Sequence, residues 1–88
     1  RHAVRVVHLA DVDRAVCHVL RLEQGTLQGP SRAWAVSHPR MVAMYLSRKH
    51  TAASYGDIGR HFGGKNHSSV VAAEKKVRQW LDANQELA

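Results

Sequence analysis

The stretch from Gly63 to Val70 carries the side chains best suited to chemistry. After two glycines and Lys65 come four polar residues in succession, Asn66-His67-Ser68-Ser69. Amide, imidazole and hydroxyl groups can donate and accept hydrogen bonds at the edges of nucleic-acid bases. Asn66 is also a good N-cap, because its side-chain oxygen can accept from a free amide in the first helical turn. The pattern therefore predicts a helix that starts near residue 66 and presents polar groups at its N-terminus.

An enzyme active site is a competing interpretation, because the chain has seven histidines. However, His61 and His67 are not spaced as an i,i+4 helical pair, and the chain has no HExxH motif. No acidic residue flanks His67 to orient it as a base toward the neighbouring serines. We therefore expect no catalytic residue, no metal ion and no cofactor in this domain.

The segments on either side of the glycines predict a helix-turn-helix over residues 54–83, with the recognition helix from about residue 66. Ser54 and Asp57 have the spacing of a capping box, with aspartate where Glu or Gln is usual. The short helix that they open directs Ile58 and Phe62 inward. Gly63 and Gly64 suit a tight turn. Apolar residues then recur at helical spacing to about residue 83: Val70, Ala73, Val77 and Leu81.

The rest of the chain is expected to be helical as well. Residues 1–10, including Val4, are expected to form a lead-in or linker. Residues 11–53 are expected to hold helices at 11–22 and 39–50, a turn near Leu27 and a loop at 29–37, with Pro39 in the first helical turn. The stripe predicted to face the core in the 11–22 helix is Val12, Ala15, Val16, Val19 and Leu20. We find no strand pattern, so the sequence predicts one all-α domain over residues 1–88, a small helical bundle.

Composition favours a polyanionic partner. Thirteen Lys and Arg against seven Asp and Glu give a formal charge of +6 in 88 residues, and nucleic acid is the first candidate for so basic a domain. One alternative is that the charge only makes a solvated basic surface. Another is a helical bundle that docks on a membrane surface or on another protein. No apolar run approaches the roughly 18 residues of a membrane span, and we expect no membrane contact. Cys17 is the only cysteine and is expected to be a buried, reduced thiol.

Several motifs at fixed spacing carry a resemblance to a known family. They are Pro39-Arg40, Met44-Tyr45-Leu46 with Arg48, Ile58-Gly59, Phe62-Gly63-Gly64 and Asn66-His67-Ser68-Ser69-Val70. Together they resemble the C-terminal domain of the bacterial replication initiator DnaA, over roughly residues 11–81. The resemblance implies a Trp-repressor-like fold that binds short double-stranded DNA boxes at the replication origin. It also implies a cytoplasmic, nucleoid-associated protein with a separate ATP-binding ATPase domain outside this chain. The abrupt start of the sequence at Arg1 suggests a domain excised from such a parent. The alternative is the same module in a transcription regulator or mobile-element protein.

The resemblance and the residue chemistry together give the candidate DNA contacts. Base contacts are expected from Asn66, His67, Ser68 and Ser69, with Ala72 packing on a thymine methyl group. Arg32 is expected to enter the minor groove, although it could be a solvated loop residue. Phosphate contacts are expected from Arg40, Arg48 and Lys49, which project from the 39–50 helix, and from Lys65. Lys75, Lys76 and Arg78 are expected to be solvated, and Trp34 to pack within its loop.

The chain departs from the family pattern on this same surface. The family usually has aspartate at position 66, threonines at 68 and 69, arginine at 65 and histidine at 72. The preferred box sequence therefore stays open. One basic face and no long apolar helix predict a monomer on an asymmetric site.

Overall fold

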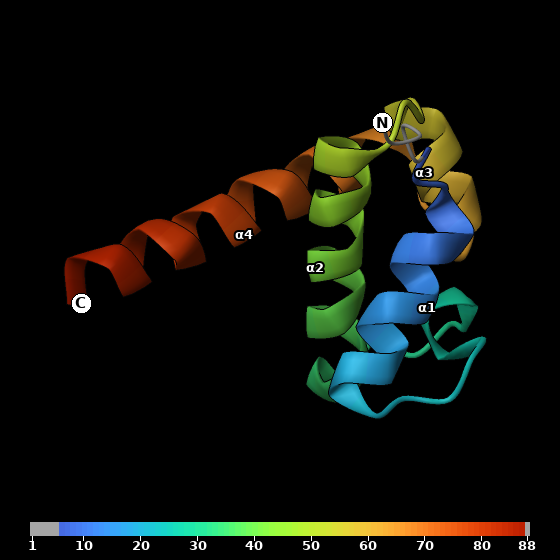
Figure 1. Cartoon of the computed structure of the whole chain (residues 1–88), viewed down its shortest axis with the longest axis horizontal. Helices are drawn as coiled ribbons and strands as arrows, with labels where there is room; N and C mark the ends of the chain where they lie inside the picture. Colours follow the sequence, from blue (N-terminus) through green and yellow to red (C-terminus); the bar gives the residue numbers. More distant parts are fainter. Residues whose placement is uncertain (1–5, 88) are drawn as a thin grey trace, which may run out of the picture.

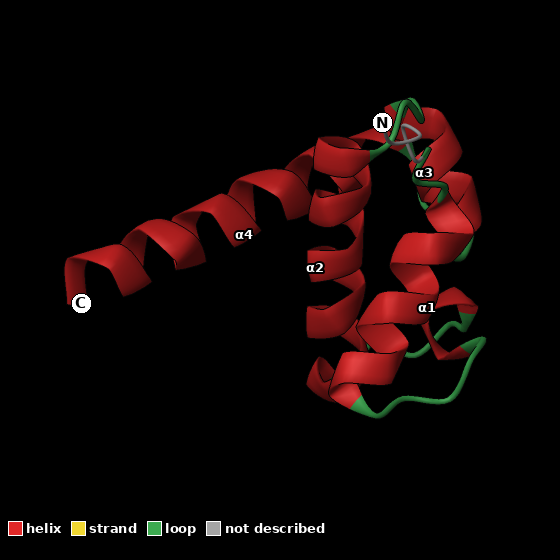
Figure 2. Cartoon of the chain, in the orientation of Figure 1, coloured by secondary structure: helices red, strands yellow, loops and turns green. Residues whose placement is uncertain are grey.

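The computed structural model describes the backbone of residues 6–87 and the side chains of residues 6–83. Its elements are α1 (Leu9–Leu20), the 3-10 helix η1 (Thr26–Gln28), α2 (Trp34–His50), α3 (Tyr55–His61) and α4 (His67–Leu87). The all-α prediction is confirmed, because every element in residues 6–87 is a helix (Figure 2). Helix α2 is central and packs against each of the other elements, while the C-terminal half of α4 extends away from them (Figure 1). No helix within residues 6–87 is both long and apolar enough to cross a membrane.

Helix α1 begins at Leu9, so residues 9 and 10 are not part of a lead-in. The backbone amide of His8 donates to Asp11 Oδ2 at 2.9 Å and caps the helix. Val4 lies outside the described residues. The predicted apolar stripe is partly wrong: Val12 and Val16 are buried, but Ala15, Val19 and Leu20 are exposed. The inner face of α1 instead includes Asp13 and Cys17, and a pattern built from apolar residues alone omits a buried carboxylate.

Helix α2 begins at Trp34, five residues before the expected start at Pro39, and the predicted 29–37 loop is therefore too long. Proline has no amide hydrogen and is favoured in the first turn of a helix. Because the sequence prediction placed Pro39 in that first turn, it put the start of α2 too late. The helix instead starts where the amides of Val36 and Ser37 donate to the carbonyl of Ala33, at 2.9 and 2.7 Å. Trp34 therefore lies on the helix, where its exposed ring contacts His38 and Trp80.

The helix-turn-helix follows the sequence closely. The capping box is confirmed, because the amide of Asp57 donates to Ser54 Oγ at 3.1 Å and the amide of Ser54 donates back to Asp57 Oδ2 at 3.4 Å. The Ser54 side chain and, after it, the Ser54 backbone amide lower the pKa of the Asp57 carboxyl group by hydrogen bonding to it. The turn glycines have positive φ, 90° at Gly63 and 72° at Gly64. Helix α4 continues four residues past the predicted end, to Leu87.

The core lies where α1, α2, α3 and α4 meet. Every element contributes fully buried side chains: Cys17 from α1, Leu27 from η1, Ala43 and Ser47 from α2, Ile58 from α3 with Phe62 directly after it, and Val70 from α4. Val77 is buried as predicted, whereas Leu81 is 43% exposed because α4 has by then left the bundle. The core is thus concentrated around the helix-turn-helix and the N-terminal half of α4.

Helix α3 and the turn that follows it approach each other at Gly59. The amide of Lys65 donates to the Gly59 carbonyl at 2.8 Å. A Cβ atom at Gly59 would lie only 2.1 Å from the Lys65 carbonyl oxygen. That oxygen belongs to the backbone, so no side-chain rotation can relieve the clash.

We predict that Gly59→Ala lowers the free energy of unfolding by about 2–4 kcal/mol, because the added methyl group forces the turn away from α3. Gly56→Ala is the matched control in the same helix, where the new Cβ would meet only side-chain atoms at ordinary contact distances, Arg60 Nη1 at 3.5 Å and Ser54 Oγ at 3.8 Å. Alanine is the better helix former, so this control should be neutral or stabilise by up to about 1 kcal/mol. Urea titration followed by circular dichroism gives both values. Equal effects of the two substitutions would contradict the close approach.

Candidate nucleic-acid interface

An open groove of about 390 Å³ separates the N-terminal end of α2 from the N-terminal half of α4. Its lining residues, called the basic groove below, are Arg32, Ser37, Arg40, Met41, Met44, Lys65, Ser69, Ala72, Ala73 and Lys76. Every ionisable residue in this lining is basic. Cations gathered in a concave surface raise the local positive potential, which attracts a polyanion.

The start of α4 is fixed by the predicted N-cap. The amide of Ser69 donates to Asn66 Oδ1 at 2.9 Å, so the cap is confirmed. This bond leaves the side-chain NH2 group of Asn66 available, because the cap uses only the oxygen. The amides of His67 and Ser68, at the start of the first turn, have no partners within the helix. The end of α4 therefore presents backbone and side-chain donors together.

The polar residues of α4 lie on two adjoining hollows. Ser69 lines the basic groove, whereas a second hollow is lined by His67, Ser68, Val71, Ala72 and Lys75. Ala72 borders both. All five side chains expected to contact bases are exposed. The structure thus brings together the residues that the sequence grouped, and their base contacts stay predictions.

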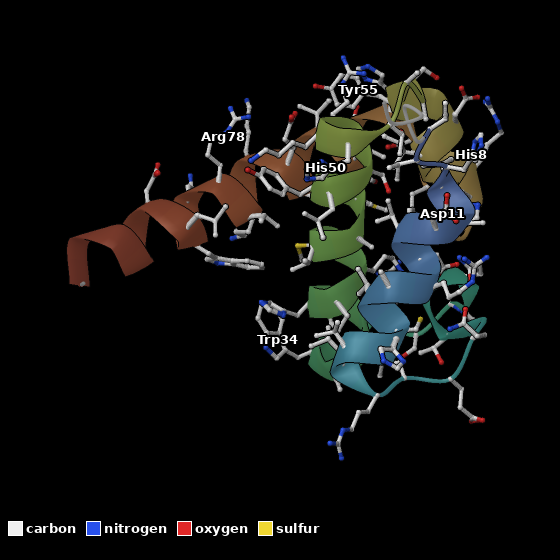
Figure 3. All side chains as sticks on the ribbon, in the orientation of Figure 1. His8, Asp11, Trp34, His50, Tyr55 and Arg78 are labelled. Carbon is white, nitrogen blue, oxygen red and sulfur yellow. The ribbon has the colours of Figure 1, made fainter. Side chains whose placement is uncertain are left out.

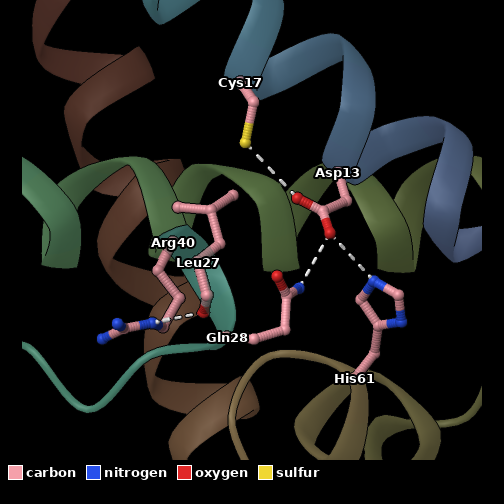
Figure 4. Close-up of polar contacts among 6 residues, drawn as sticks. All are labelled: Asp13, Cys17, Leu27, Gln28, Arg40 and His61. Atoms are coloured by element: carbon pink, nitrogen blue, oxygen red, sulfur yellow. Dashed lines mark hydrogen bonds and ion pairs between the residues drawn. The ribbon is translucent and has the colours of Figure 1, made fainter. Parts of the chain in front are cut away.

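Arg40 does not project from α2 as expected. Its side chain is buried, Nε donates to the Leu27 carbonyl at 3.0 Å, and Nη2 donates to the Gly29 carbonyl at 2.9 Å. Figure 4 shows the guanidinium group beside Leu27. Burial lowers the pKa of Arg40, but an arginine remains charged at neutral pH. These two hydrogen bonds hold the segment that leads to Arg32 against α2. A phosphate contact from the remaining N–H donors of Arg40 stays a prediction.

The other predicted cations occupy different positions. Arg32 is exposed, and both it and Lys65 line the basic groove. Arg48 and Lys49 lie in the last turn of α2, outside the lining of the groove. The Arg48 guanidinium lies 4.4 Å from the centre of the Tyr55 ring, and Lys49 Nζ lies 5.8 Å from the centre of the Tyr45 ring. Tyr55 and His50 are labelled in Figure 3, where both lie near this end of α2.

Lys76 is a candidate contact that the sequence assigned to the solvated side of the last helix. It lines the basic groove together with Ser69 and Ala72. The three positions are related by i,i+3, i+4 and i+7 spacing, which places them on one helix face. That spacing could have identified Lys76 from the sequence.

A buried carboxylate joins the helix-turn-helix to the first half of the chain (Figure 4). Asp13 accepts from Gln28 Nε2 at 2.8 Å, and its other contacts are His61 Nε2 at 3.2 Å and Cys17 Sγ at 3.5 Å. Burial is the main cause that raises the pKa of the Cys17 thiol, which agrees with a protonated donor and with the expected buried thiol. Among the described residues, His, Cys, Asp and Glu form no group of three that could hold a metal ion.

A short capped helix, a glycine turn and a polar helix end beside a basic groove are the features of a DNA-binding helix-turn-helix domain. Residues 9–77 match the family described as the bacterial dnaA protein helix-turn-helix. The chain belongs to this family.

Relatives extend the similarity over most of the chain. The chromosomal replication initiator protein DnaA of Sphingopyxis alaskensis is 41% identical over 81 residues, which cover 92% of this chain. The proteins of the same name from Rickettsia bellii and Wolbachia pipientis are 35% and 31% identical, over 94% and 96% of the chain. The matched region is 18% of the length of each of these relatives.

We predict that Arg40→Met lowers the free energy of unfolding by about 1–3 kcal/mol, because it leaves the Leu27 and Gly29 carbonyls without their donor. Lys76→Met is the matched control, since it removes a charge from the same groove but orphans no buried acceptor, and it should change stability by less than about 0.5 kcal/mol. Urea unfolding of both variants makes the comparison. If Arg40→Met is as mild as its control, Arg40 does not hold the loop.

Proposed function

We propose that this domain binds double-stranded boxes at a bacterial replication origin with sequence specificity, as part of a replication initiator. The observation that carries the proposal is the basic groove, whose lining includes both Arg32 and, from α4, Ser69 and Ala72. One rigid unit can thereby offer a helix to the major groove and an arginine to the neighbouring minor groove. The shared name of the relatives supports the biological setting.

In this proposal Asn66 and His67 read base edges, with Ser68, Ser69 and Ala72 beside them. The NH2 group of Asn66 can donate to an acceptor such as N7 of a purine, while Oδ1 has a second lone pair beyond the one that caps the helix. The serines can donate to bases or phosphates. Ala72 can contact a thymine methyl group. Sequence preference then comes from this one end of α4.

Cations around the helix supply the sequence-independent part of the affinity. Lys65 and Lys76, on the basic groove, are assigned to phosphates, and so are Arg48 and Lys49 at the end of α2. The free donors of Arg40 add to this set. Arg32 is assigned to the minor groove, whose negative potential is strongest where A·T pairs make it narrow.

The remaining activities belong to the parent protein, because the chain spans only 18% of the length of its relatives. We assign ATP binding to an ATPase domain elsewhere in that parent. This domain takes part as a DNA-binding module without a catalytic step or a membrane contact of its own. It binds as a monomer on an asymmetric site, in the cytoplasm and at the nucleoid.

We predict that Asn66→Ser and His67→Ala each weaken binding to the preferred duplex by about 1–3 kcal/mol, through loss of a base contact. Serine retains a capping oxygen, so Asn66→Ser tests the amide donors without removing the cap. The preferred duplex comes from selection with the wild-type chain on a random pool. Fluorescence anisotropy then measures affinity and stoichiometry.

The control for that experiment is a duplex of random sequence, where both variants should bind almost as well as wild type. Equal weakening on the two duplexes would show that these residues only position the backbone. Selection that yields no preferred sequence would overturn the proposed function itself. A two-to-one complex would contradict the monomeric assignment.

We predict that Arg32→Ala weakens binding most on duplexes with A·T pairs at the edge of the site, by about 1–2 kcal/mol. The reason is that a narrow minor groove most strongly attracts a cation that enters it. The measurement compares wild type and variant on matched duplexes with A·T or G·C pairs at that edge. Lys76→Ala is the control, since loss of a phosphate contact should weaken both duplexes alike. An Arg32→Ala effect that is the same on both duplexes would assign Arg32 to phosphate.

A further inference from the structure

Tyr55, the first residue of α3, contacts three side chains from two other helices, α2 and α4. Its hydroxyl group donates to Glu74 Oε1 of α4 at 2.8 Å. Its ring and that of His67 lie 4.8 Å apart, centre to centre, at an angle of 73°. The guanidinium group of Arg48 lies over the ring at 4.4 Å. One aromatic side chain therefore touches both a residue assigned to bases and a residue assigned to phosphate.

Each of these contacts restrains its partner. Edge-to-face ring pairs have a preferred geometry, so an exposed imidazole beside Tyr55 loses rotational freedom before any DNA arrives. An arginine stacked on an aromatic face is similarly restrained, and Nη1 of Arg48 also donates to the Ala53 carbonyl at 3.3 Å. Arg48 has five N–H donors, so donors remain for a phosphate.

Tyr55 is itself held in place by further contacts. Glu74 accepts its hydroxyl hydrogen and also forms an ion pair with Arg78 at 3.6 Å. The Tyr55 side chain is partly buried and packs against the hydrophobic core. The ring is thus anchored at its hydroxyl end and buttressed by the core, while His67 and Arg48 are exposed.

We propose that Tyr55 is a positioning residue that sets the sequence specificity of this domain by holding His67, and with it Arg48, in the orientation that DNA requires. The inference rests on the proposed function. Ordering a side chain on binding costs conformational entropy, and Tyr55 removes part of this cost from the side chain that reads a base. A residue with only a packing role would change stability but would not change the ratio between preferred and random duplexes.

The test is a double-mutant cycle on the 88-residue chain, with Tyr55→Leu, His67→Ala and their combination. Leucine keeps apolar bulk in the core but removes the ring. We expect Tyr55→Leu to weaken binding to the selected duplex about tenfold and binding to random duplex by less than about twofold. In the His67→Ala background the same change should cost only about twofold, because no imidazole is left to orient.

Tyr55→Phe and Glu74→Ala provide a second test that leaves the ring in place. Both delete the same hydrogen bond, so each should weaken binding to the selected duplex by about two- to threefold, and their combination should cost no more than either alone. If a urea titration shows that Tyr55→Leu does not fold, this pair of variants tests the proposal for Tyr55 instead. Additive losses, or no loss, would overturn the proposal.

The outcomes for Tyr55 and for the proposed function are distinguishable. If wild type prefers the selected duplex but Tyr55→Leu costs the same with and without His67, the proposal for Tyr55 is wrong and the proposed function stands. Equal loss on selected and random duplexes would also reduce Tyr55 to a packing residue. If wild type shows no preference at all, the proposed function fails and the proposal for Tyr55 fails with it.

Discussion

The backbone contact between Gly59 and Lys65 is the constraint on which the interface depends. The two residues share a hydrogen bond of 2.8 Å, and the space for a Cβ atom at Gly59 is occupied by the Lys65 carbonyl. This approach fixes where the turn ends and therefore where α4 begins. The position of the Asn66 cap and the side of α4 that faces α2 both follow from it. A small change in this contact would move the residues of α4 that are assigned to DNA.

A second set of buried polar contacts fixes the other wall of the basic groove. Arg40 binds two backbone carbonyls near η1, and Asp13 joins η1 to α1 and α3. Desolvating a charged group costs several kcal/mol unless good hydrogen bonds replace its water, and the bonds of Arg40 are charge-assisted. The loop before α2 is thereby held against the helix-turn-helix. The backbone that carries Arg32 is therefore held in place, although the Arg32 side chain itself is exposed.

Local signals were sufficient for the helix-turn-helix but not for the contacts between distant segments. The Ser54 capping box, the turn glycines and the Asn66 cap each depend on residues within a few positions, and all were predictable. The start of α2 was missed because Pro39 is a common first-turn residue. The burial of Arg40 and Asp13 was missed because the partners of Arg40, and the partners of Asp13 outside α1, lie at least 11 residues away, and no periodicity in one helix reveals such partners.

The departures from the family pattern have a physical consequence at the start of α4. An aspartate at position 66 would cap the helix but could only accept hydrogen bonds from a base, whereas Asn66 caps and keeps two N–H donors. Serines at 68 and 69 keep the hydroxyl groups of threonine but lose the methyl groups that pack on thymine. Ala72, which borders both hollows of α4, adds apolar surface without a donor. The Tyr55 ring packs edge-on against His67 within this altered set, so under the proposed function we expect specificity to depend more heavily on the imidazole.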